Sequence, residues 1–131
     1  MTKLTQEDLN HFTGDLVRYR HPLNRKVIYT PGIRHVAEEG EAYWLIDAIA
    51  SWIGSPQFNG AAANDYRIGE MHFWLLGTSW GGGAELTARA DADELAFIKQ
   101  AIAFTDFPMR RIDIWSAFDG EHWTLYLPSE H

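Results

Sequence analysis

The segment 42–53, Ala-Tyr-Trp-Leu-Ile-Asp-Ala-Ile-Ala-Ser-Trp-Ile, decides how the rest of the chain is arranged. Its apolar residues recur at the three- and four-residue spacing of one helix face. They are Ala42, Leu45, Ile46, Ile49 and Ile53. Aromatic residues occupy much of the remaining circumference, and a helix that is apolar nearly all round is usually buried. We therefore expect 42–53 to form the central helix of the core and to end at Gly54.

Two shorter helices and a hairpin are expected before this segment. Thr5-Gln-Glu-Asp combines a capping hydroxyl with acidic residues in a first turn, and Gly14 is expected to stop that helix. Thr30-Pro31-Gly32 places a capping hydroxyl before a proline at the first helical position. Between these two starts, Leu16–Arg20 and Lys26–Thr30 predict a β-hairpin.

The second half of the chain is rich in predicted strands. Strands are expected at Met71–Thr78 and Ala84–Ala90, joined by a mobile loop at Ser79–Gly83, and Gln57–Ile68 is expected to be a loop. Two further strands are expected around the Asp119-Gly120 turn, at 112–118 and 123–127. The spacing within Leu95–Thr105 fits either a helix or a strand.

This order of elements predicts one α+β domain over residues 1–131. An antiparallel sheet of about five to seven strands would pack against two or three helices. The length of 131 residues agrees with one domain. With 46% hydrophobic and 14% aromatic residues, the chain is not disordered. The absence of cysteine excludes disulfides, thiolate metal sites and a cysteine nucleophile.

The charge of the chain is unevenly distributed. The formal net charge is −7, whereas general affinity for nucleic acid needs the opposite sign. Residues 41–131 carry thirteen acidic and five basic side chains. The first forty residues hold a basic cluster that could bind phosphate or an acidic protein surface, or could protect a sheet edge. It comprises Arg18, Arg20, Arg25 and Lys26.

Several strings of residues occur together in an order typical of one family. They are Leu4-Thr5-x-x-Asp8-Leu9-x-x-Phe12-Thr13-Gly14, Tyr29-Thr30-x-Gly32, Ala42-Tyr43-Trp44-Leu45-Ile46-Asp47-x-Ile49-Ala50, Thr105-Asp106-Phe107-Pro108 and Leu127-Pro128-Ser129-Glu130. The chain thereby resembles a family of small bacterial proteins of unknown function found on plasmids, phages and genomic islands. That resemblance favours a strand for Leu95–Thr105. It implies no reaction or cofactor, only a role in transfer, stability or evasion of host defence.

Two well-known catalytic motifs are missing from the sequence. It contains no G-x-x-x-x-G-K-[ST] and no H-E-x-x-H. Asp47 within the apolar helix could be a desolvated general base beside Tyr43; alternatively it could lie on a narrow exposed stripe or accept a structural hydrogen bond. Asp106 could be an acid at a strand end, or part of an ordinary turn. His35 with Glu38 or Glu39 has the spacing of two metal ligands without a third, so no metal site is expected. No cofactor is expected either.

Acidic turns and one tryptophan are the candidates for protein binding. Trp80 lies beside three glycines, and an exposed tryptophan is a common interface hot spot. Acidic clusters can match a nucleic-acid groove on a partner protein, although they also serve solubility. The candidate protein-binding residues are Trp80, Asp91, Asp93, Glu94, Asp113, Asp119 and Glu121.

Three functions remain open from the sequence. The first is a non-catalytic protein that binds a protein partner, in its sharpest form an inhibitor of a CRISPR effector complex or restriction enzyme. The second is an enzyme with an unrecognised site around Asp47, Tyr43 or Asp106. The third is a nucleic-acid binder that uses the basic cluster. No apolar run of signal-peptide or membrane-spanning length occurs, so a cytoplasmic location without membrane contact is expected.

Overall fold

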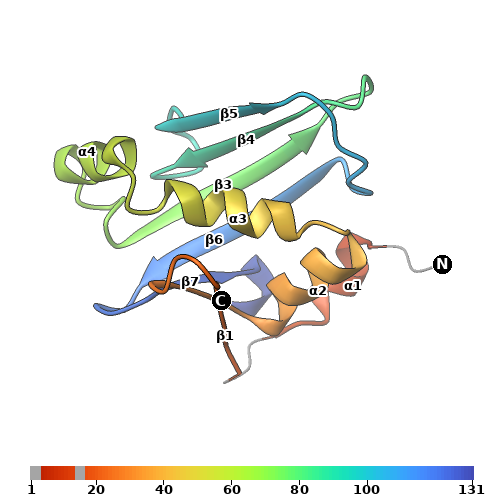
Figure 1. The fold of residues 1–131 in the computed structure, drawn as a ribbon, viewed down its shortest axis with the longest axis horizontal. Coiled ribbons are helices and arrows are strands. Elements are labelled where there is room, and N and C mark those ends of the chain that lie inside the picture. Colours follow the sequence, from red (N-terminus) through yellow and green to blue (C-terminus); the bar gives the residue numbers. More distant parts are fainter. Residues whose placement is uncertain (1–3, 14–16) are drawn as a thin grey trace.

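A computed structural model describes residues 4–13 and 17–131. The predicted helix stop at Gly14 and the beginning of the predicted strand Leu16–Arg20 lie outside the described residues. The described chain forms one seven-stranded sheet, in the order β1-β2-β7-β6-β3-β4-β5, with helices on one of its faces (Figure 1). This arrangement confirms the predicted α+β class. No helix among the described residues is long and apolar enough to cross a membrane.

The helical layer contains four α-helices. They are α1 (Gln6–Asn10), α2 (Pro31–Glu39), α3 (Tyr43–Trp52) and α4 (Pro56–Asn64). The predicted central helix corresponds to α3, which crosses the middle of the sheet (Figure 1). The prediction of a loop over Gln57–Ile68 is wrong for α4, where Ser55 caps the helix by accepting a hydrogen bond from the Phe58 amide.

The strands pair as a mixed sheet. They are β1 (Tyr19–Arg20), β2 (Val27–Tyr29), β3 (Met71–Thr78), β4 (Ala84–Arg89), β5 (Ile98–Ile102), β6 (Arg111–Phe118) and β7 (Trp123–Tyr126). The spacing within Leu95–Thr105 fits either a helix or a strand, and the structure has the strand β5 there. All neighbouring strands are antiparallel except β2 and β7, which are parallel. The predicted sheet was wholly antiparallel; the helices between β2 and β3 form a crossover that permits the one parallel pair.

The core lies between the sheet and the helices. Alternate residues of β3 and β6 are buried, since successive side chains of a strand point to opposite faces. Fully buried side chains from both layers meet there, including Val27, Ile33, Ile49, Ile114 and Leu125. The other set of alternate residues on β3 and β6 is only half-buried, which leaves the opposite face of the sheet open to a ligand.

Candidate functional site

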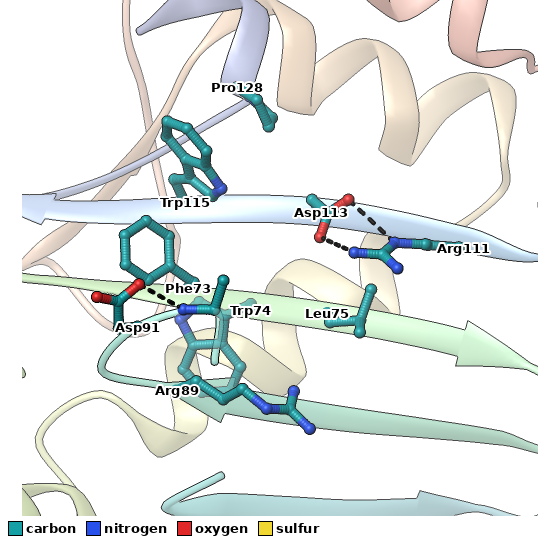
Figure 2. Close-up of a pocket in the computed structure, with 10 residues that line it drawn as sticks. Phe73, Trp74, Leu75, Arg89, Asp91, Arg111, Asp113, Trp115 and Pro128 are labelled. Atoms are coloured by element: carbon teal, nitrogen blue, oxygen red, sulfur yellow. Dashed lines mark hydrogen bonds and ion pairs between the residues drawn. The ribbon is translucent and has the colours of Figure 1, made fainter. Parts of the chain in front are cut away.

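The face of the sheet opposite the helices contains a hollow of about 540 Å³ (Figure 2). Strands β3, β4 and β6 supply most of its lining, together with the turn after β4. The lining residues are Phe73, Trp74, Leu75, Arg89, Asp91, Ala92, Arg111, Asp113, Trp115 and Pro128. A volume of this size lies within the range of small-ligand pockets, and it can also receive one or two side chains of a partner protein.

Aromatic rings form the floor of this hollow. Phe73 on β3 is the register partner of Trp115 on β6, so both side chains project from the same face. Their ring centroids are 5.3 Å apart and the planes meet at 86°, an edge-to-face contact. Leu75 extends the apolar surface along β3 (Figure 2). The floor therefore presents apolar surface that no helix covers.

Charged side chains surround the floor with both signs present. Arg111 donates two hydrogen bonds of 3.2 Å to Asp113, and this pairing raises the pKa of the arginine. Arg89 donates to the hydroxyl of Thr87 at 2.7 Å. The carboxylate of Asp91 accepts the amide of Ala92 at 2.7 Å. Among the lining residues two arginines balance two aspartates, so the hollow has no strong electrostatic preference for an anion or a cation.

The loop between β3 and β4 carries Trp80 just beyond the end of β3. The side chain of Trp80 is 92% exposed, and the guanidinium of Arg110 lies 4.2 Å from its ring centroid. Hydrogen bonds from the Ser79 amide to the Gly83 carbonyl and from the Gly82 amide to the Ser79 carbonyl close the loop. Gly82 has a φ of 89°, which glycine adopts without strain. The alternative that Trp80 folds back over the sheet is therefore wrong.

Trp80 is linked to the hollow through two consecutive residues of the chain. Arg110 stacks on Trp80, and the next residue, Arg111, lines the hollow. Phe104 lies near the same loop, because a β-carbon at Gly82 would be 3.1 Å from its ring. The phenyl group of Phe104 is 75% exposed. We call the hollow together with Trp80, Phe104 and Arg110 the open-face surface.

Only some of the predicted acidic residues join the open-face surface. Asp91 and Asp113 line the hollow. Asp93 and Glu94 continue the turn after β4, where Glu94 pairs with Arg67 at 2.6 Å. Strand β4 begins beside Thr78 and ends beside Phe73. Trp80, before β4, and Asp93 and Glu94, after it, therefore lie at opposite ends of β3.

The second acidic turn, between β6 and β7, contains Asp119 and Glu121. The carboxylate of Asp119 accepts the amides of His122 and Glu121 at 2.7 and 2.8 Å, and these bonds lower its pKa. This turn lies at the same end of the sheet as the turn after β4, because the ends of β6 and β4 both flank the start of β3. Asp119 therefore has a structural role in its own turn.

Asp47 has a structural partner instead of a catalytic environment. Its side chain is 63% exposed, so it is not the desolvated base considered from the sequence. The buried His21 donates from Nε2 to Asp47 at 2.8 Å, while Nδ1 accepts the amides of Leu23 and Asn24. Both ring nitrogens are thereby occupied. The hydroxyl of Tyr43 donates to Glu38 and not to Asp47.

The other residues considered for catalysis or metal binding, Asp106 and His35, also lie apart from one another. Asp106 is exposed in a turn in which the Thr105 hydroxyl accepts the Phe107 amide at 3.1 Å, and Phe107 is buried in the core. His35 packs against Phe12, with ring centroids 5.1 Å apart. Among residues 4–13 and 17–131, no three His, Asp or Glu side chains lie close enough together to hold a metal ion.

The basic cluster lies at the β1 side of the sheet. Arg20 belongs to β1, and Arg25 and Lys26 lie in the turn before β2. Arg18 lines a second hollow of about 240 Å³ with Tyr126, among others. Binding of phosphate or an acidic surface by these residues stays a prediction.

Residues of the family strings hold the helices in place. Glu130 accepts hydrogen bonds from the Thr30 hydroxyl at 2.7 Å and from the amides of Gly32 and Leu127 at 3.3 and 2.9 Å. It therefore joins the C-terminal 3-10 turn η1 (Pro128–Glu130) to the beginning of α2. The Ser129 hydroxyl donates to the carbonyl of Leu9 in α1. These strings therefore contribute more to the stability of the fold than to the open-face surface.

Sequence reasoning missed most of the open-face surface. The hollow's aromatic and basic lining residues, Phe73, Trp115, Arg89 and Arg111, were not among the candidates. One signal was available, because 72–76 reads His-Phe-Trp-Leu-Leu and is apolar on both faces of a strand. In an antiparallel sheet covered on one side only, such a strand indicates an apolar patch on the uncovered face.

Comparison with known proteins identifies the family and no function. The chain matches no curated protein and no solved structure. One family model matches residues 3–131, nearly the entire chain, and it is described as a family of unknown function (DUF6876). The protein is therefore a member of the DUF6876 family.

Proposed function

We propose that this protein is a non-catalytic binding protein that recognises a protein partner through the open-face surface. The observation that carries the proposal is Trp80, which is 92% exposed on the hydrogen-bonded loop that follows β3, a strand that also lines an uncovered apolar hollow. Exposed apolar surface next to polar residues is typical of protein interaction sites. Tryptophan and arginine are also the residues most enriched at interface hot spots, and here they are stacked on each other.

The chemistry of the hollow favours binding over catalysis. Its lining has no serine, histidine or lysine, and its two carboxylates are engaged: Asp113 pairs with Arg111, and Asp91 accepts the Ala92 amide. Ser79 lies in the string Gly77-Thr78-Ser79-Trp80-Gly81, which has the G-x-S-x-G spacing of a nucleophile elbow. This string lies in a hairpin between two strands and not at a strand-to-helix turn, and the Ser79 hydroxyl donates to the Gly83 carbonyl at 3.1 Å. Arg111 and Asp113 also neutralise each other's charge within the hollow. A partner that inserts an apolar side chain over Phe73 and Trp115 would bury apolar surface beside a charge pair that is already formed.

The partner that we propose is a component of a bacterial defence system, a CRISPR effector complex or a restriction enzyme. This narrower proposal rests on the net charge of −7 and the resemblance to proteins of mobile elements. Two acidic turns at one end of the sheet add negative charge beyond the hollow. Such charge can match a surface that normally binds nucleic acid.

Pull-down experiments test both levels of the proposal. The purified protein, Trp80→Ala and Leu23→Ala would be immobilised and exposed to purified effector complexes and restriction enzymes. Leu23 is a matched control because it is 89% exposed but lies in the turn before β2. We expect wild type and Leu23→Ala to retain the partner and Trp80→Ala to lose most of the binding, since hot-spot truncation weakens binding by roughly thirtyfold or more.

Activity in cells provides the second measurement. Cells that express the protein should lose interference or restriction against an incoming plasmid, and Trp80→Ala should restore it. Unimpaired interference and restriction, with no bound effector, would overturn the defence proposal. Equal binding by Trp80→Ala and wild type would overturn the assignment of the open-face surface.

A further inference from the structure

Strand β5 is a free edge of the sheet. It lies last in the strand order and, within the described part of the chain, pairs only with β4 (Figure 1). The pairing with β4 is regular over all five residues, from Ile98 to Ile102. A regular edge strand offers its outward N–H and C=O groups to another strand.

The two edge strands of this sheet differ in how well they are protected against pairing with a strand of another chain. At the opposite edge, β1 has only two residues and lies next to the basic cluster, both of which discourage pairing. Strand β5 reads Ile-Lys-Gln-Ala-Ile, with one charge, no proline and no bulge in its register. Strand β5 is therefore much less protected against such pairing than β1.

Exposed apolar side chains flank β5 at both ends. Leu95, three residues before the strand, is 94% exposed, and Phe104, two residues after it, is 75% exposed. They are among the most exposed large apolar residues of the described chain. A strand added alongside β5 would lie between these two residues.

We propose that β5 pairs with β5 of a second copy of this chain, antiparallel about a two-fold axis at Gln100. Such a symmetric interface requires that the strand be complementary to itself. In this register Ile98 lies opposite Ile102 and Lys99 lies opposite Ala101, so the two lysines do not face each other. The segment 95–96 of each copy lies opposite 104–105 of the other, which brings Leu95 and Phe104 to the two ends of the interface.

Charge substitutions at Ala101 test this register. Ala101 is exposed, and its partner in the proposed dimer is Lys99 of the second copy. Ala101→Lys would place like charges opposite each other twice, and Ala101→Asp would place opposite charges there twice. We expect the dimer dissociation constant to rise roughly two- to thirtyfold for Ala101→Lys and to fall for Ala101→Asp, from the usual size of cross-strand charge effects. The double variant Lys99→Glu/Ala101→Lys should restore dimerisation.

The measurement is sedimentation equilibrium of the full chain at about 1 to 500 µM, a range suited to a small interface. Ala63→Lys in α4 makes the same change at another exposed alanine and should leave the dimer unchanged. Circular dichroism would confirm that each variant is folded. A wild type that is monomeric throughout would overturn the proposal, as would a dimer that responds equally to Ala101→Lys and Ala101→Asp. Pairing of β5 only with a strand of a different protein would also overturn it.

Discussion

Mild acid should destabilise this protein through one buried histidine, His72 on β3. The ring is fully buried, and its Nδ1–H donates to the Ile68 carbonyl at 3.2 Å. Four aromatic rings surround it at centroid distances of 4.8 to 5.8 Å. They belong to Phe58, Trp74, Phe97 and Trp123. Burial lowers the pKa of His72 from 6.5 to about 4, and the hydrogen bond to Ile68 opposes this change only in part.

The sign and size of the effect follow from proton linkage. Between pH 6.5 and pH 4 the unfolded chain binds a proton at His72 and the folded chain does not, so the free energy of unfolding decreases as the pH falls. A difference of one in pKa corresponds to about 1.4 kcal/mol, which gives about 3 kcal/mol over the full interval. About 2 kcal/mol of this is lost between pH 7 and pH 5.

Urea denaturation at pH 7 and pH 5 measures this loss. Wild type, His72→Phe and His11→Gln would be compared, with His11 as an exposed control histidine. Removing His72 removes its titration, so wild type should lose about 2 kcal/mol more than His72→Phe between the two pH values. His11→Gln should behave as wild type.

Equal losses for wild type and His72→Phe would refute the reasoning. An NMR titration gives an answer that does not depend on the variant. The ring resonances of His72 should stay constant between pH 7.5 and pH 5.5, whereas an exposed histidine titrates there. A His72 resonance that titrates near pH 6.5 in the folded protein would also refute it.

Three further predictions concern the hydrogen bonds accepted by Glu130, the hydrogen bond between His21 and Asp47, and the basic cluster. Glu130→Ala should lower the free energy of unfolding by about 1–3 kcal/mol, because it removes the acceptor for three hydrogen bonds. Gly32→Ala should have a similar effect in thermal denaturation, since its β-carbon would lie 2.5 Å from Oε1 of Glu130, and the two losses should not add. Asp47→Ala should lower the melting temperature, because the buried Nε2–H of His21 loses its acceptor; loss of function at unchanged stability would instead support the enzyme alternative. Gel shifts at low salt should show at most weak DNA binding by residues 18–26, and tight, salt-dependent binding would contradict the protein-partner proposal.

Local signals in the sequence were sufficient for most elements of the fold. The capping residues Thr5 and Thr30 begin α1 and α2 as predicted, and the periodicity of 42–53 identified α3. The start of α4 was missed, although Ser55-Pro56 is the same kind of start as Thr30-Pro31. Three alanines and an Asn-Gly pair in 57–64 are also compatible with a loop, but packing of Phe58 in the core stabilises the helix.

The candidate site was less accessible to such reasoning. The exposure of Trp80 depends on the closing hydrogen bonds of its loop and on the contact with Arg110, which lies thirty residues later in the chain. The hollow depends on the pairing of β3 with β4 and β6, which brings Phe73, Arg89 and Trp115 together. No spacing along the chain encodes that proximity.

Asp47 shows how tertiary structure decided between two chemical interpretations. From the sequence it was a carboxylate in an apolar helix, which could be a base or a hydrogen-bond acceptor. The structure places it at the surface as the acceptor for His21, twenty-six residues earlier in the chain. The sequence by itself determined the helix starts, the strand-rich second half and the uneven charge, because these depend on neighbouring residues. Only the tertiary structure decided which strand face stayed uncovered and which edge stayed unpaired, because strand order and helix placement are set by contacts between residues far apart in the chain.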